Sequence, residues 1–221
     1  MKWTHPELER VFDTESDAVP TLIVENRPFF VRLLSDLYQQ TDGFSGQSVL
    51  SRNDTPIDFT KNAEIIENFV PFDINRKTLI TKMISALEKA ASSPEQTVPT
   101  GDLLQRIEEY LGGIAFDFPC DIIFPKLSIS GLIKSAGPEL RAEYETISEA
   151  VLDYMELVQT FDRERLFITV NMRCFVADEE MALFLSTAHS HGYHLLMLES
   201  HAYPLLPMES RTVVDDDLCE F

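Results

Sequence analysis

The chain has 221 residues, of which 44% are hydrophobic and 25% are charged, so it can bury a core and form one or two domains. Its 18 Lys and Arg residues against 37 Asp and Glu residues give a formal net charge of −19. A nucleic-acid-binding protein is expected to be basic. Taken alone, this charge argues against DNA binding.

Cysteine usage and hydropathy exclude two further classes of protein. The three cysteines, Cys120, Cys174 and Cys219, are odd in number and far apart, so they form neither a disulfide framework nor the close pairs of a zinc site. No apolar run approaches the roughly 20 residues of a membrane span, and the acidic start lacks the pattern of a secretory signal. We therefore expect a soluble protein of a reducing cytoplasm with no membrane partner.

The first third of the chain predicts the beginning of an α/β domain. Thr21–Glu25 is a short apolar run rich in β-branched residues, which is typical of a buried strand. A helix is predicted to follow, capped by Asn26 and continuing to Gln40. Two weaker strands are predicted near Gln47–Ser51 and Ala63–Phe69.

The middle of the chain is predicted to be helical. Asn75 is a candidate cap for a helix with an apolar face from Leu79 to Leu87, which ends in a breaker segment. Thr100 is a candidate cap for a second helix, which Gly112–Gly113 would end. These two helices are expected to form an antiparallel hairpin. A short helix over Ser128–Ser135 and a longer one over Ala142–Phe161 complete the helical region.

The last sixty residues alternate again between strands and a helix. Leu166–Val170 and His194–Glu199 read as strands, Asp178–His189 as the helix between them, and Thr212–Val214 as an edge strand. Such alternation predicts a parallel or mixed sheet with helices on its faces. The predicted fold is an α/β domain of residues 1–59 and 162–221, with an α-helical insertion of residues 60–161.

Several catalytic or metal-binding readings find little support. The strand–helix connection Asn26-Arg27-Pro28 carries none of the glycine-rich motifs that cradle phosphate, although Glu199 ends a strand as a magnesium-binding acid would. His189, His191 and His194 resemble a metal cluster, but no acid or cysteine at matching spacing completes it. The sequence contains no GxSxG elbow, so it gives no indication of a hydrolase.

The distribution of charge along the chain is more informative than its sum. Residues 57–141 contain nine bases and twelve acids, so this stretch carries −3 and the remainder carries −16. Arg76, Lys77 and Lys82 lie beside or opposite the apolar face of the first predicted helix of the insertion, where they either bind a polyanion or only keep the helix soluble. Asp117 and Asp121 lie four apart in a proline-bent segment and are either calcium ligands or plain loop carboxylates.

The order of these elements resembles the Csn-type adaptation protein of type II-A CRISPR systems over nearly the whole chain. The segments that carry the resemblance are TLIVEN with FFVRLLSDLYQ, FDINRKTLITKMISALEKA, ISGLIKSAG, RLFITVN and HLLMLES. The match is specific at FDIN and its helix, at LIKSAG and at the strand–helix–strand end. It is loose near residues 42–56 and 112–126.

This resemblance implies a fold and a function. The family has an NTPase-like α/β head without a working phosphate loop, and a helical leg inserted into it. Four chains form a ring, stabilised by calcium, that encloses linear double-stranded DNA loaded at free ends. Its members act in spacer acquisition with the CRISPR integrase complex and the effector nuclease, and no enzymatic activity is attributed to them.

Family positions carry over to particular residues of this chain. The residues expected to face DNA are Lys134, Lys126, Arg141, Arg76, Lys77 and Lys82. Asp117 and Asp121 fall where the family has a cluster of calcium-binding acids, although this sequence has fewer acids there. Two alternatives remain: an acidic scaffold that bridges the integrase and the nuclease, and a nucleotide-dependent switch on the NTPase-like fold.

Overall fold

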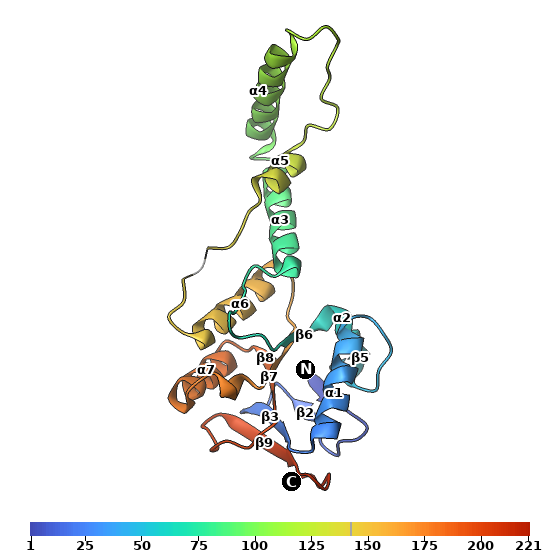
Figure 1. The fold of residues 1–221 in the computed structure, drawn as a ribbon, viewed down its shortest axis with the longest axis vertical. Helices are drawn as coiled ribbons and strands as arrows, with labels where there is room; N and C mark the ends of the chain where they lie inside the picture. The colour runs from blue at the N-terminus through green and yellow to red at the C-terminus, as the bar shows by residue number, and fades with distance from the viewer. Residues whose placement is uncertain (142) are drawn as a thin grey trace. The chain divides into compact units, whose positions relative to one another are not determined.

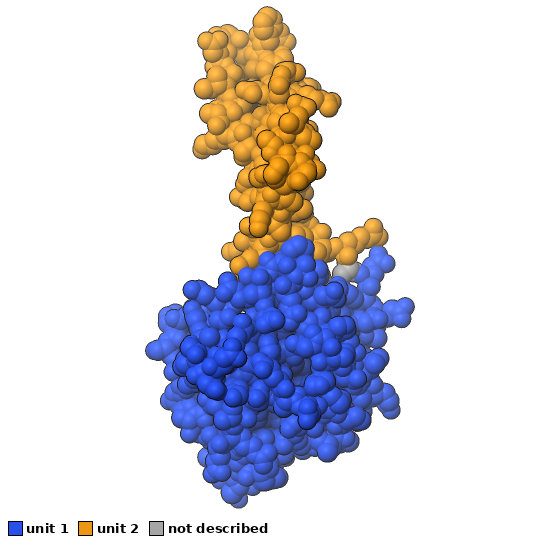
Figure 2. Space-filling model, turned by 180° about the vertical axis from the view of Figure 1, so that it is seen from behind, with its two compact units in different colours: residues 1–73, 142–221 blue, residues 74–141 orange. Residues whose placement is uncertain are grey.

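The computed structural model describes residues 1–141 and 143–221, which form two compact units (Figures 1 and 2). Unit 1 comprises Met1–Asp73 and Ala142–Phe221, and unit 2 comprises Ile74–Arg141. Unit 2 is thus inserted into unit 1, as a helical insertion into an α/β domain. The boundaries differ from the predicted ones, because residues 60–73 and 143–161 supply a strand and a helix that pack in unit 1.

A five-stranded parallel sheet forms the centre of unit 1. Its strand order is β6 (Ala63–Ile66), β7 (Leu166–Val170), β8 (His194–Glu199), β3 (Val19–Val24) and β9 (Glu209–Val214). Every residue of β3, β7 and β8 is buried, which is why these strands are continuous apolar runs in the sequence. The predicted edge strand is confirmed as β9.

One face of this sheet is covered by α1 (Arg27–Thr41), α2 (Phe59–Asn62) and a second, antiparallel sheet. The strand order of that sheet is β2 (Phe12–Asp13), β1 (Lys2–Thr4), β4 (Val49–Arg52) and β5 (Thr55–Ile57). Trp3, Leu33 and Leu50 are almost fully buried between the layers. The sequence did not predict β1 and β2, because strands of two or three residues show no periodicity.

The other face carries α6 (Ile147–Phe161) and α7 (Asp178–Ser190), with the short 3₁₀ turn Met172–Cys174 between β7 and α7 (Figure 1). The helix predicted over 142–161 begins at Ile147, where the Thr146 hydroxyl accepts from the Glu149 amide at 3.2 Å. Residue 142 lies outside the described residues. The Tyr154 hydroxyl donates to Glu64, which ties α6 to β6.

Unit 2 consists of α3 (Lys77–Ala91), α4 (Thr97–Ala115) and α5 (Ile129–Ala136). Helix α3 packs against α5, whereas no residue of α4 is buried. The prediction of a hairpin between the first two helices of the insertion was therefore wrong. The apolar face of α4 has no covering helix within the chain that the structure describes.

The ends of α4 also differ from the prediction. Thr100 is not its cap, because the helix begins at Thr97 with Gln96 as the preceding residue. Pro99 was read as part of a breaker, but it stands in the first turn, where a missing N–H removes no hydrogen bond. The helix continues through Gly112 and Gly113 to Ala115. In the described residues, no helix combines the length and the apolar character needed to cross a bilayer.

Candidate nucleic-acid interface

Two basic residues stand at the beginning of α3. Arg76 is the N-cap residue without a side-chain capping bond, and Lys77 is the first helical residue and exposed. The helix dipole disfavours cations at this end, so neither charge is placed there to stabilise the helix. The apolar side of α3 buries Leu79 and Met83 instead. The helix dipole therefore gives neither base a helix-stabilising role at this position.

Asn75 brings a third base to this end of α3. It was predicted to cap the helix, but its side chain instead bonds the backbone of Leu140. Its Nδ2 donates to the Leu140 oxygen at 3.1 Å, and its Oδ1 accepts from the Leu140 amide at 2.7 Å. Because Arg76 follows Asn75 and Arg141 follows Leu140, this clamp draws together two arginines 65 positions apart in the sequence.

The predicted DNA contact Lys134 lies on α5 and is held by α3. Helix α5 is capped by Ser128, whose Oγ accepts from the Gly131 amide at 3.1 Å, and it ends at Gly137, whose φ of +60° suits glycine. The Lys134 ammonium lies 3.1 Å from Glu88 Oε1 and 3.0 Å from the Ser130 hydroxyl. Hydrogen bonds from Ser130 and Lys134 lower the pKa of the Glu88 carboxyl. Glu88 thus offsets part of the Lys134 charge.

The six predicted DNA contacts do not all converge on one point. Arg76, Lys77 and Arg141 gather at the start of α3, and Lys134 faces Glu88 in the last turns of that helix. Lys126 is exposed in the segment before α5, where it lines a mostly apolar cavity of about 420 Å³. Lys82 is half-buried on α3.

Lys89 is a further candidate contact that the sequence-based prediction did not include. Lys89 is exposed in the last turn of α3, seven residues after Lys82. A spacing of seven returns to nearly the same side of an α-helix, so the two lysines share a face. That spacing is visible in the sequence and was the available signal.

The boundaries of the two units separate the acidic part of the chain from the neutral part more clearly than the range 57–141 does. Unit 2 contains eight basic and eight acidic residues and is therefore neutral. Unit 1 contains the other ten bases and 29 acids, so it carries the whole net charge of −19. The expected −3 for residues 57–141 came from residues 57–73, whose four acids and one base belong to unit 1. A polyanion is thus repelled by unit 1 and is not repelled, on average, by unit 2.

The expected calcium ligands are not gathered into a cation site. Asp117 and Asp121 are both exposed in the segment after α4. Asp121 lines a cavity of about 370 Å³ with Phe118 and Cys120, and Asp117 is not among its lining residues. Within the described residues, no group of three or more His, Cys, Asp or Glu side chains could hold a metal ion. Calcium takes six to eight oxygen ligands, so these two aspartates do not by themselves make its site.

The three histidines of the HxHxxH run do not converge either. His189 is in the last turn of α7, and His191 caps that helix and stacks on Tyr193. His194 begins β8, where it is buried and lies 2.9 Å from the Thr14 hydroxyl. The run is the polar connection between a helix and a strand.

The turn from β3 into α1 lacks the geometry of a phosphate-binding loop. Only Glu25 and Asn26 separate the strand from the helix. The Asn26 side chain accepts from the Phe29 amide at 2.9 Å, and Pro28 has no N–H to offer. The first turn of α1 therefore has few amides left for a phosphate group, which argues against a nucleotide-dependent switch.

Comparison with known proteins identifies the family. The family model of the CRISPR-associated protein Cas_Csn2 matches residues 40–218. The chain belongs to the Cas_Csn2 family. It is also similar to the crystal structure of Stu0660 of Streptococcus thermophilus, with a TM-score of 0.55 and 14% identity over 91% of this chain and 69% of that one. At that identity the similarity to Stu0660 shows the shared fold alone.

Membership of the Cas_Csn2 family confirms the resemblance found in the sequence. The matched region contains both FDIN, which spans the boundary from unit 1 into unit 2, and LIKSAG, at the end of α5. It also covers all the candidate DNA and calcium residues. The chain is therefore a CRISPR-associated protein whose family takes part in adaptation.

Proposed function

We propose that this protein binds linear double-stranded DNA at its free ends, without sequence preference and without catalysing a reaction, during acquisition of new spacers. The observation that carries this proposal is the separation of charge between an acidic unit 1 and a neutral unit 2 with bases at the start of α3. Lysines and arginines would contact phosphates, which positions the DNA but reads no bases.

The decisive experiment compares DNA topologies. Gel shifts with linear and closed circular duplexes of equal length are expected to show binding to the linear form only, if DNA threads through a ring. The logarithm of the binding constant should fall linearly with the logarithm of salt concentration, because bound counterions are released. Equal binding to both topologies would contradict threading.

Self-association into a ring of four copies is part of the proposal, and α4 supports it. The helix exposes Val98, Leu103, Tyr110 and Ile114, and the segment that follows exposes Phe116, Phe118 and Ile123. A run of exposed large apolar side chains marks an interaction surface. A neighbouring copy of unit 2 would bury them.

Changing Leu103 and Ile114 together to aspartate is therefore expected to convert the assembly to smaller species. These side chains are 44% and 52% exposed, so the double variant should leave the folded chain intact. Mass measured by light scattering after size exclusion checks the prediction, and far-UV circular dichroism checks the fold. Gln105→Asp and Arg106→Asp, at exposed positions of the same helix, form the matched control. An unchanged mass in the Leu103/Ile114 variant would place the interface elsewhere.

In this proposal calcium binds only where two copies of the chain meet. Asp117 and Asp121 provide too few oxygens alone, but they lie in the exposed segment that follows α4. A second copy meeting this segment would bring further oxygens to it. Mass measurements in calcium and in chelator are expected to differ, and Asp117→Asn with Asp121→Asn should abolish that difference.

Removing the charge of Glu88 is expected to strengthen DNA binding. Glu88→Gln keeps a hydrogen bond to Ser130 but frees the Lys134 ammonium from its ion pair. Exposed ion pairs are weak, so we expect a modest gain, about threefold at low salt. Titration of labelled linear duplex measures it, with Glu95→Gln as an exposed control on the same unit. A loss of affinity would mean that the pair positions Lys134 for DNA.

A second candidate function rests on unit 1. Its charge of −19 would suit an acidic scaffold that bridges the CRISPR integrase complex and the effector nuclease. Association with both proteins that survives nuclease treatment, together with absent DNA shifts, would favour this function over DNA binding.

A further inference from the structure

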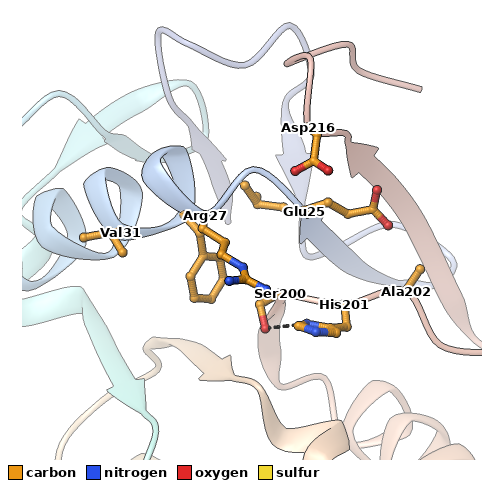
Figure 3. A pocket seen from close by; sticks show the side chains of 9 residues that line it. Glu25, Arg27, Val31, Ser200, His201, Ala202 and Asp216 are labelled. Carbon is orange, nitrogen blue, oxygen red and sulfur yellow. Dashed lines mark hydrogen bonds between the residues drawn. The ribbon is translucent and has the colours of Figure 1, made fainter.

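A cavity of about 740 Å³ lies in unit 1 where the parallel strands β3 and β8 end (Figure 3). After β3 the chain enters α1 on one face of the sheet. After β8 it runs through residues 200–208 to β9, on the far side of β3. Two adjacent strands whose chains leave in different directions open a crevice, and α/β proteins bind ligands at such points. The volume is within the range of small-molecule sites.

The cavity is lined by charged side chains that lack partners. In residues 1–141 and 143–221, no hydrogen bond or ion pair engages the side chains of Glu25, Arg27 or Asp216, which all line it. The Ser200 hydroxyl lies 3.0 Å from His201 Nδ1 and adds a polar pair. Val31 lines the same cavity and is 60% exposed, so it offers an apolar wall.

The charges are separated within the cavity. Figure 3 shows the Arg27 guanidinium directed toward Ser200 and His201, whereas the carboxylates of Glu25 and Asp216 stand on the side of the chain that follows β9. A ligand that fills the cavity therefore meets a positive side and a negative side.

A simple anion fits this cavity poorly. The first amides of α1 are already used, because Phe29 donates to Asn26 Oδ1 and Phe30 to the Asn26 carbonyl, both at 2.9 Å. The two carboxylates, and the −19 of unit 1, would also repel a net negative charge. A ligand that carries a carboxylate together with cationic groups, and is not net negative, avoids this repulsion and can pair with both sides.

We propose that this cavity binds a small zwitterion, whose carboxylate is held by Arg27 and whose distal guanidinium or ammonium group is held by Glu25 and Asp216. A free basic amino acid has this chemistry. The proposal is independent of DNA binding, since every residue involved belongs to unit 1.

Calorimetric titration of the full chain with three related probes tests the proposal. L-Arginine has both charged ends, citrulline lacks the distal charge and agmatine lacks the carboxylate. Saturable binding of L-arginine with a Kd of about 1 mM is expected. Each of the other two probes should bind at least about tenfold more weakly, because each lacks one charge-assisted contact. Absence of saturation with L-arginine, or equal binding of all three, would overturn the proposal.

Variants assign each end of the ligand. Arg27→Gln should weaken the binding of L-arginine by about tenfold and leave the binding of agmatine unchanged. Asp216→Asn should weaken the binding of L-arginine and of agmatine but not that of citrulline. Arg106→Gln and Glu95→Gln, exposed in unit 2, are matched controls. Equal losses for all three probes in Arg27→Gln would refute the assignment of the carboxylate. DNA titrations of the same variants should be unchanged, so the two proposals can fail separately.

Discussion

Changing Lys77 and Lys126 together to glutamate is expected to weaken binding of linear duplex DNA by about a hundredfold at moderate salt. Both lysines are exposed, and among the described residues neither side chain has an ion-pair partner, so their charges are available to phosphates. A hydrogen bond to a charged group contributes about 1.5 kcal/mol or more, and two such losses make about 3 kcal/mol, or a hundredfold.

The salt dependence gives a second readout of the same variant. The slope of the log–log plot should fall by about one for each phosphate contact that is lost. Lys61→Glu is the matched control for each single variant, Lys77→Glu and Lys126→Glu, because each changes the net charge by the same amount and Lys61 is also exposed but belongs to unit 1. If the control loses as much affinity as either single variant, the effect is one of net charge and unit 2 is not the interface.

Replacing Glu199 by glutamine is expected to stabilise unit 1 above neutral pH. Glu199 ends β8 and is 1% exposed; its Oε1 accepts from the Arg173 amide at 3.2 Å, and no hydrogen-bond donor reaches its Oε2 within the described residues. Burial, only partly opposed by Arg173, raises the pKa of the carboxyl to about 7. An ionised Glu199 is thus a cost to the folded state.

The direction of the pH dependence follows from that shift. The folded protein holds the Glu199 proton more tightly than the unfolded chain, whose ordinary value is 4.5, so this group lowers the free energy of unfolding as pH rises from 4.5 to about 7. The full penalty above pH 7 is on the order of 3 kcal/mol. Burial lowers the pKa of His5 and His194, which contribute the opposite trend below pH 6.5. The difference in the free energy of unfolding between the wild type and the variant isolates the contribution of Glu199.

Urea denaturation at pH 5 and at pH 8 measures this difference. The single tryptophan, Trp3, is fully buried in unit 1, so its fluorescence follows the unit that holds Glu199. Glu199→Gln should gain stability at pH 8 relative to wild type and gain less at pH 5. Glu67→Gln, at an exposed position of the same unit, should show no such pH dependence. Equal gains at both pH values would mean that Glu199 ionises normally.

Local patterns predicted most of unit 1 correctly. The apolar runs at Thr21–Glu25, Leu166–Val170 and His194–Glu199 are strands of the parallel sheet, and Asn26 caps α1 as expected. These elements were predictable because a strand buried on both faces must be apolar throughout, and because a cap acts on its own helix. The resemblance to the family could be recognised because it also rests on such local sequence patterns.

Predictions from local sequence patterns were wrong in unit 2 where contacts between distant residues decide the structure. Asn75 has the chemistry of a cap, but its side chain is taken by the backbone of Leu140. The apolar stripe of α4 looks like a buried face, yet none of its residues is buried in the chain. A sequence pattern shows that a face is apolar and does not show which element covers it.

The sequence by itself determined the fold class, the family resemblance and the absence of a phosphate loop, because each depends on residues close together in the chain. Only the tertiary structure decided that the net charge of −19 belongs wholly to unit 1, because the boundary between units is set by packing. The same holds for the pairing of Lys134 with Glu88 and the hydrogen bonds between Asn75 and Leu140. These contacts join residues 46 and 65 positions apart, a separation at which no local propensity acts.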